Sequence, residues 1–72
     1  MEDRLLTVAE VAEILQTNVD AVYKLHRSGL LKCMKLGRLK CRAKTLEAFL
    51  EEFDGMDISD PENVQPLSIN YT

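Results

Sequence analysis

The 72-residue sequence predicts a small domain that is mainly α-helical and carries one β-hairpin. Three observations lead to this fold class. Residues 7–29 hold two short helical patterns on either side of a tight turn, residues 33–42 alternate around a glycine as hairpin strands do, and residues 44–53 repeat apolar side chains at helical spacing. A chain of this length folds as one domain and buries only about 60% of the surface that it exposes when unfolded. We therefore expect two helices, a hairpin and a closing helix around one modest core.

The first helix is predicted to begin after Thr7. Thr7 lies three residues before Glu10, so its hydroxyl can accept from the Glu10 amide while the Glu10 carboxylate accepts from the Thr7 amide, which is a reciprocal capping box. Leu6 and Val11 occupy the two positions of a hydrophobic staple. The apolar stripe of this helix has a 3.6-residue period and consists of Val8, Val11, Ala12 and Leu15.

The second helix is predicted to begin at Asn18, a favoured N-cap, and to end at Gly29, which readily adopts the left-handed conformation. The stripe expected to face the core consists of Val22, Leu25 and His26. The opposite stripe follows the spacing i, i+3, i+4, i+7 and consists of Asp20, Tyr23, Lys24 and Arg27. Side chains of this kind on one helix face can enter a groove of DNA. The two helices and their turn therefore predict a helix-turn-helix.

The segment CMKLGRLKCR predicts a β-hairpin with a two-residue turn at 37–38, because glycine in the first position allows a type II′ turn. This register places Leu36 opposite Leu39. One face is then apolar and holds Met34, Leu36, Leu39 and Cys41. The other face is basic and holds Lys35, Lys40 and Arg42 together with Cys33. Because Cys33 and Cys41 lie on opposite faces in this register, we expect no disulfide between them.

A hairpin with one basic face can serve as the wing of a DNA-binding domain. Arg38, at the tip, would enter the adjoining minor groove, since narrow A·T-rich grooves attract guanidinium groups. The alternative is an ordinary edge hairpin whose lysines prevent aggregation. The neighbouring helix-turn-helix pattern favours the wing.

The closing helix is predicted over residues 44–53, where the apolar stripe is Leu46, Phe49, Leu50 and Phe53. Residues 5–53 thus form the predicted winged helix-turn-helix domain. Residues 54–72 contain two prolines, four acids and no base, and we expect an acidic, flexible tail. Alternatively, the tail folds back on the basic surface or docks on a partner through Val64, Leu67, Ile69 and Tyr71.

The charge distribution points to nucleic acid although the net charge is −3. Residues 24–44 hold eight bases and no acid, whereas residues 1–23 hold one base against five acids and residues 45–72 hold seven acids and no base. A basic block between acidic segments can create a local positive field. The candidate DNA contacts are Asn18, Tyr23, Lys24, Arg27, Lys35, Arg38, Lys40 and Arg42. Asn18, Tyr23, Lys24 and Arg27 are the candidates for base edges, and the six basic residues among the eight are the candidates for phosphates.

Several function classes are not expected. The chain lacks a nucleophile–base constellation, a phosphate-binding glycine loop and the length to enclose a substrate pocket, so we predict no enzyme, cofactor or small-molecule substrate. Cys33, Cys41 and His26 fall short of the four ligands that a zinc site usually needs, so no metal is expected. No run approaches the ~20 apolar residues of a membrane span and the charged start MEDR does not look like a signal peptide, which predicts a cytoplasmic protein without membrane contact.

The motifs LTVAEVAEIL, VYKLHRSG, KLGR and LEAFL, in this order over residues 5–53, resemble the excisionase-type winged helix-turn-helix domains of the mercury-regulator superfamily. The resemblance implies a recognition helix from Asn18 to Arg27, with Tyr23, Lys24 and Arg27 toward DNA and with Arg38 and Lys40 in the wing. Family members from phages and other mobile elements bend DNA and bias an integrase toward excision, or act as small regulators. The chain departs from the family pattern in its turn, which has Gln16 in place of glycine, and at Val19 and Asp20, where polar or basic residues are usual.

Two functions from different classes follow. The first is a small DNA-binding protein of a mobile element or phage, excisionase-like or a transcriptional regulator, whose partners are double-stranded DNA and either an integrase or another copy of itself. Six phosphate contacts would give a slope near −5 for log affinity against log salt. The alternative is a protein-interaction module of the same fold with weak DNA affinity, similar to a terminase small subunit. The acidic first helix, Val19, Asp20 and the tail favour this alternative.

Overall fold

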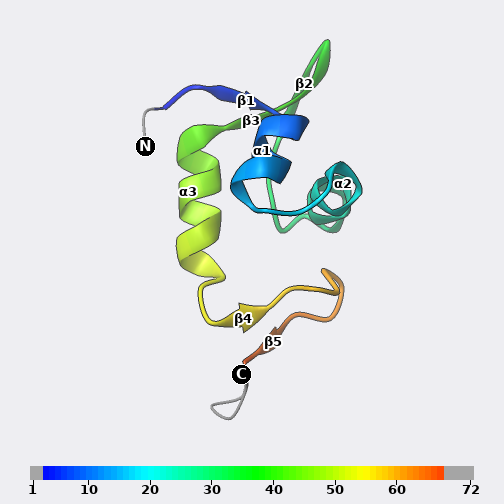
Figure 1. The fold of residues 1–72 in the computed structure, drawn as a ribbon, viewed down its shortest axis with the longest axis vertical. Coiled ribbons are helices and arrows are strands. Elements are labelled where there is room, and N and C mark those ends of the chain that lie inside the picture. The colour runs from blue at the N-terminus through cyan, green and yellow to red at the C-terminus, as the bar shows by residue number, and fades with distance from the viewer. Residues whose placement is uncertain (1–2, 68–72) are drawn as a thin grey trace.

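The computed structural model describes residues 3–67. Three helices and two small antiparallel sheets follow one another along the chain (Figure 1), in the order β1 (Leu5–Thr7), α1 (Val8–Ile14), α2 (Val19–Ser28), β2 (Met34–Leu36), β3 (Arg38–Arg42), α3 (Ala43–Glu52), β4 (Met56–Asp57) and β5 (Gln65–Pro66). The architecture agrees with the expected helix-turn-helix followed by a hairpin and a closing helix. In this part of the chain no helix is both long and apolar enough to cross a membrane.

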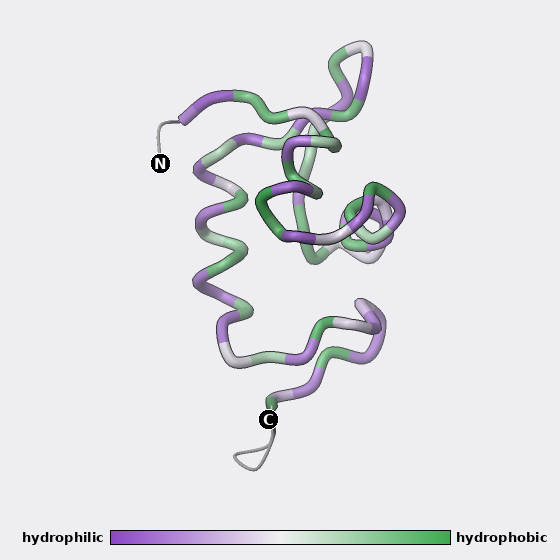
Figure 2. The backbone as a smooth tube through the Cα atoms, viewed as in Figure 1, coloured by the Kyte–Doolittle hydropathy of each residue, from purple (hydrophilic) through white to green (hydrophobic). Residues whose placement is uncertain are grey.

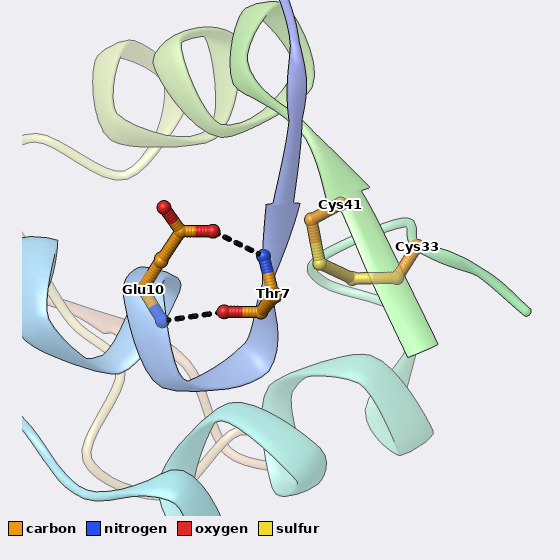
Figure 3. Close-up of a disulfide and its surroundings, with 4 residues drawn as sticks. All are labelled: Thr7, Glu10, Cys33 and Cys41. Carbon is orange, nitrogen blue, oxygen red and sulfur yellow. Dashed lines mark hydrogen bonds between the residues drawn. A yellow bond between two sulfur atoms is a disulfide. The ribbon is translucent and has the colours of Figure 1, made fainter. Parts of the chain in front are cut away.

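The predicted capping box at the start of α1 is confirmed. The Glu10 amide donates to the Thr7 hydroxyl at 3.1 Å, and the Thr7 amide donates to the Glu10 carboxylate at 2.9 Å (Figure 3). Leu6 and Val11, the expected staple, are both buried. The start of α1 is therefore determined by side chains within five residues of one another.

The turn between α1 and α2 closes without the glycine that is usual there. Gln16 has φ of 56°, and its amide donates to the Glu13 carbonyl at 3.1 Å while the Thr17 amide donates to the Ala12 carbonyl at 2.9 Å. These two bonds form a Schellman motif, in which the left-handed position commonly belongs to glycine. A residue with a Cβ atom is strained at positive φ, so the backbone conformation of Gln16 lowers the stability of the folded protein locally.

Both predicted ends of α2 are confirmed. The Asn18 side chain accepts from the Ala21 amide at 2.8 Å, and Gly29 adopts φ of 87° at the C-terminus. Val22 and Leu25 are buried as expected. His26 is half-buried at the edge of the core, in agreement with its assignment to the inward stripe.

The register of the β2–β3 hairpin differs from the prediction by one residue. The observed partners are Met34 and Lys40, Lys35 and Leu39, and Leu36 and Arg38, so that Gly37 alone forms the tip with φ of 72°. The predicted pairing of Leu36 with Leu39 is therefore wrong. Partners in an antiparallel pair point to the same side of the sheet. As a result Met34 and Leu36 do not join Leu39 and Cys41 on the core side.

The chain before the hairpin explains this register. Leu31 is completely buried, and side chains of an extended segment alternate between faces, so Cys33 also points inward and Met34 outward. On β3, Cys41 lies on the inner face because it pairs with the buried Leu6 of β1. The inner face of the hairpin is thus determined by residues outside the hairpin.

The expectation that Cys33 and Cys41 remain unpaired is also wrong. The two residues form a disulfide with their Cα atoms 4.4 Å apart (Figure 3). They are direct cross-strand neighbours in the observed register, which places both sulfurs on one face. The disulfide therefore links the base of the hairpin to the core, where Cys41 is fully buried.

The core lies between the three helices and the inner face of the β1-β3-β2 sheet. Its buried residues are Leu6, Val8, Val11, Ala12, Val22, Leu25, Leu31, Cys41, Ala43, Leu46 and Phe49. Phe53 packs against this cluster with its ring 5.1 Å from that of Phe49. Leu50 was expected in the same stripe, but it is exposed and borders a surface groove.

The segment after α3 forms a second, smaller sheet at the end of the molecule opposite the β2–β3 hairpin (Figure 1). Met56 pairs with Pro66 and Asp57 with Gln65, and Ile58 packs against the core. Two of the apolar residues proposed for partner docking, Ile69 and Tyr71, lie outside the described residues. The flexibility of residues 54–72 stays a prediction.

Candidate nucleic-acid interface

The outward face of α2 brings together the side chains that the helical spacing predicted. Tyr23, Lys24 and Arg27 are all exposed, and they follow one another at i, i+1 and i+4 on the face opposite the buried Val22 and Leu25. Both helix ends are capped, so this face belongs to a helix of defined length. Tyr23 and Arg27 therefore stand on a surface that residues 3–67, the described part of the chain, leave exposed.

Asn18 lies at the N-cap of α2 and not on the exposed face that holds Tyr23, Lys24 and Arg27. Its side-chain oxygen Oδ1 accepts from the Ala21 amide, and its side-chain NH2 group is the part with hydrogen atoms to donate to a base or a phosphate. The sequence placed Asn18 correctly as the N-cap of α2.

Three cations share the outer face of the β2–β3 hairpin. Arg38, Lys40 and Arg42 alternate along β3, away from the buried Cys41. Lys35 lies opposite Leu39 and therefore points to the other side of the hairpin. The predicted grouping of Lys35 with Lys40 and Arg42 on one face is wrong, because the observed register of the hairpin differs by one residue from the predicted register.

Arg42 is engaged by an acid from the start of the chain. Its guanidinium lies 2.5 Å from the Asp3 carboxylate, which also accepts from the Lys44 amide at 3.4 Å. The bond to Arg42 lowers the pKa of Asp3 below its ordinary value, and the bond to Asp3 raises the pKa of Arg42. Since the Asp3 carboxylate would repel a phosphate, Arg42 is less available to DNA than Arg38.

The outer face of the hairpin also carries large apolar side chains. Leu36 is 65% exposed and Met34 is 42% exposed, and both share this face with their cationic partners Arg38 and Lys40. Figure 2 shows hydrophobic and hydrophilic segments alternating along the projecting hairpin. The face is thus a mixture of cations and apolar groups, in contrast to the uniformly basic face that the sequence predicted.

One comparison with known proteins identifies the family. The family model described as helix-turn-helix domain matches residues 5–54, which is more than two thirds of the chain. The chain belongs to this helix-turn-helix family. Family membership indicates that DNA is the partner of this protein. Neither the curated proteins nor the solved structures gave a significant match.

In the helix-turn-helix domain, α2 and the β2–β3 hairpin are the elements that project on the side away from α3 in the view of Figure 1. The matched residues include both elements and end just beyond α3. The cations Lys24 and Arg27 come from α2, and Arg38 and Lys40 come from the hairpin.

The flank of α2 that holds Asp20 and Lys24 borders a groove of about 980 Å³. The groove lies between α2, the end of α3 and the segment 54–61, which contributes Asp54 and Asp57 to the lining. The Asp57 carboxylate accepts from the Ser59 amide at 3.0 Å, and this bond lowers the pKa of Asp57. One side of the helix-turn-helix domain is thus acidic beside α2.

Sequence reasoning missed two sets of residues at this interface. Asp3 was missed because its contact with Arg42 spans 39 positions and follows no local spacing. Met34 and Leu36 were assigned to the core side of the hairpin. The burial of Leu31 indicates the opposite, because alternation along the extended chain then turns Cys33 and Lys35 to the side of Leu31 and turns Met34 and Leu36 outward.

Proposed function

We propose that this helix-turn-helix protein binds double-stranded DNA as a winged helix, with α2 in the major groove and the β2–β3 hairpin as a wing on the adjoining backbone and minor groove. The observation that carries this proposal is the uncovered face of Tyr23, Lys24 and Arg27 on a helix capped at both ends. An α-helix of this kind fits the major groove, where base edges can be read.

The contacts divide by chemistry. Tyr23 in the middle of α2 and Arg27 in its last turn are suited to base edges, and Arg38 and Lys40 on the wing are suited to phosphates. Arg42 is paired with Asp3 and Lys35 points to the other face, so neither is part of the proposed contact surface. Four cations therefore remain as phosphate or base contacts: Lys24, Arg27, Arg38 and Lys40.

The biological role that fits this surface best is that of a cytoplasmic, excisionase-like architectural factor or small transcriptional regulator of a mobile element or phage. The resemblance of residues 5–53 to excisionase-type domains supports it. A single domain with one short recognition helix reads few base pairs, so cooperation with an integrase or with further copies on DNA belongs to this proposal.

A second function, binding of a protein partner, is favoured by one specific observation. The flank of α2 at Asp20 faces an acidic groove wall at Asp54 and Asp57, and such a flank repels DNA. A partner with basic side chains would be complementary to this flank.

The test is a fluorescence titration of a labelled mixed-sequence duplex over a series of salt concentrations. With Arg27 on a base edge, the three phosphate contacts of Lys24, Arg38 and Lys40 predict that log affinity falls with log salt with a slope of roughly −3, since each phosphate contact contributes about 0.9. Arg38→Gln should reduce the slope by about one. The matched control is Lys44→Gln on α3, which removes the same charge and should leave the slope unchanged.

Absence of binding at tens of micromolar protein in low salt would contradict the DNA proposal, because non-specific affinities are typically ~10⁻⁴ to 10⁻⁶ M even at physiological salt. A slope near −5 or steeper would place Lys35 or Arg42 back in the contact surface.

A further inference from the structure

The outer face of the wing combines cations with side chains that should avoid water. Leu36 is the most exposed of the large hydrophobic residues in the described part of the chain, at 65%, and Met34 is exposed at 42%. Both point to the same side as Arg38 and Lys40. An apolar surface interleaved with cations is complementary to a polyanion that also offers apolar contacts.

The minor groove of DNA has this chemistry. Its walls carry phosphates and sugars, and its floor exposes base edges and base steps. It is only about 6 Å wide, so few protein elements fit into it. The tip of the wing is slim, because Gly37 carries no side chain and leaves open space around its Cα atom. Leu36 and Arg38 flank this tip and lie opposite each other.

We infer that Leu36 acts as an apolar wedge in the minor groove, supported by Met34 and placed by Arg38 and Lys40, and that it partly unstacks a flexible pyrimidine–purine step. Leucine and methionine are among the side chains that proteins insert between base steps from the minor groove, and TA and CA/TG steps unstack most easily. The inference rests on the proposed DNA-binding function and names the step that the wing prefers.

The disulfide and the backbone pairing of the hairpin would hold Leu36 in place during insertion. Unstacking a base step costs a few kcal/mol, so a wedge must be held in place against that cost. The Cys33–Cys41 disulfide ties the base of β2 to β3, and Cys41 is anchored in the core beside Leu6. The wedge is thus three residues from a covalent cross-link, which limits how far Leu36 can be pushed back.

The experiment uses a 24-base-pair duplex of alternating TA steps in which 2-aminopurine replaces one adenine. Every register on this duplex presents a TA step, and the fluorescence of 2-aminopurine rises when the base unstacks. At saturating wild-type protein we expect a rise of at least twofold. On a duplex with a continuous A-tract, which has no pyrimidine–purine step, we expect little change.

The variants separate the wedge from general binding. Leu36→Ser should abolish most of the fluorescence rise, Leu36→Met should keep it, and both should keep the salt slope of the wild type. The control is Leu50→Ser, at an exposed leucine of α3 that lies outside the wing, which should behave as the wild type. Because Leu36 is mostly exposed, its substitution is expected to change the stability very little, and a thermal melt verifies that each variant is folded.

The outcomes distinguish this inference from the proposed function. Wild-type protein that binds the duplex with the expected salt slope but leaves the fluorescence unchanged overturns the wedge and leaves the DNA-binding proposal intact. Wild-type protein that does not bind either duplex overturns both. Self-association of free protein that Leu36→Ser abolishes, measured by analytical ultracentrifugation, would assign the apolar face to a second copy of the chain and would also overturn the wedge.

Discussion

α2 and the β2–β3 hairpin, which we propose as the recognition helix and the wing, are stabilised in different ways. α2 lies against the core through Val22 and Leu25 and is capped at both ends by Asn18 and Gly29. The wing projects from the core and exposes most of its residues, and a disulfide fixes its base. α2 is therefore held mainly by packing against the core, whereas the hairpin is held by a covalent bond and by backbone pairing.

The largest expected effect on stability comes from breaking the disulfide at the base of the hairpin. Reduction of the Cys33–Cys41 disulfide, which closes a loop over a sequence separation of 8, should lower the free energy of unfolding by about 2–3 kcal/mol through the loop-closure entropy of the unfolded chain. Urea unfolding with and without dithiothreitol measures it. A Cys33→Ala/Cys41→Ala variant serves as the control and should not respond to reductant. Equal midpoints for the wild type in both conditions would show that the disulfide does not stabilise the fold.

The second prediction separates the two elements by their roles in DNA binding. Arg27→Ala should weaken binding to a selected cognate site by about 1–3 kcal/mol and weaken binding to mixed sequence much less, because a base contact is lost. Arg38→Ala should weaken binding to both duplexes by a similar factor, because a phosphate contact is lost. Competition titrations with the two duplexes give both ratios. If Arg27→Ala also reduces both affinities equally, α2 contacts only the backbone.

The third prediction concerns the left-handed residues that follow α1 and α2, Gln16 and Gly29. Gln16→Gly should raise the free energy of unfolding by about 0.5–1 kcal/mol, since it removes a left-handed strain of roughly 1–2 kcal/mol and adds a smaller entropic cost. The matched opposite change is Gly29→Ala, which meets no neighbouring atom but must hold φ of 87°, and it should destabilise the protein by about 1 kcal/mol. Thermal melts of both variants measure the pair. A loss of stability in Gln16→Gly would mean that the Gln16 side chain contributes a contact that outweighs the strain.

The smallest effect concerns the acid at the base of the wing. Asp3→Asn should raise DNA affinity about twofold at low salt, because it releases Arg42 and removes a negative charge near the proposed interface. The matched control is Glu2→Gln, which removes one acid next to Asp3 in the sequence. An equal gain in both variants would attribute the effect to net charge alone.

The pH dependence of stability follows from Asp3 and two further carboxyl groups. The pKa values of Asp3, Glu10 and Asp57 are all lowered in the folded protein, so their ionised forms stabilise it at pH values above their ordinary values of 3.8 to 4.5. This contribution is lost as the pH falls through the lowered pKa values. These three groups therefore cause no change in stability between pH 5 and 8 and a loss below about pH 4.

The helices could be predicted from the sequence because their signals are local. Thr7 and Glu10, or Asn18 and Ala21, are three residues apart, so these caps can be recognised without knowing which distant residues pack against the helices. The outward face of α2 followed from the same periodicity. The prediction of Tyr23, Lys24 and Arg27 on one exposed face therefore agrees with the structure.

The wing could not be predicted in the same way because its register depends on distant partners. A hairpin that slips by one residue exchanges the faces of a whole strand. The choice here depends on Leu31 and on the pairing of Leu6 with Cys41 across 35 positions. For this reason the disulfide, the position of Lys35 and the exposed Met34 and Leu36 all escaped sequence reasoning, as did the contact of Asp3 with Arg42.

Amide chemical-shift changes on titration with a duplex would show whether α2 and the wing form one DNA-binding surface, as we propose. We expect the largest changes at residues 18–27 and 34–40, while the outer face of α3 from Glu47 to Glu52 stays unchanged. Changes confined to α3 and the 54–67 segment, or changes at α2 with none on the wing, would contradict this proposal.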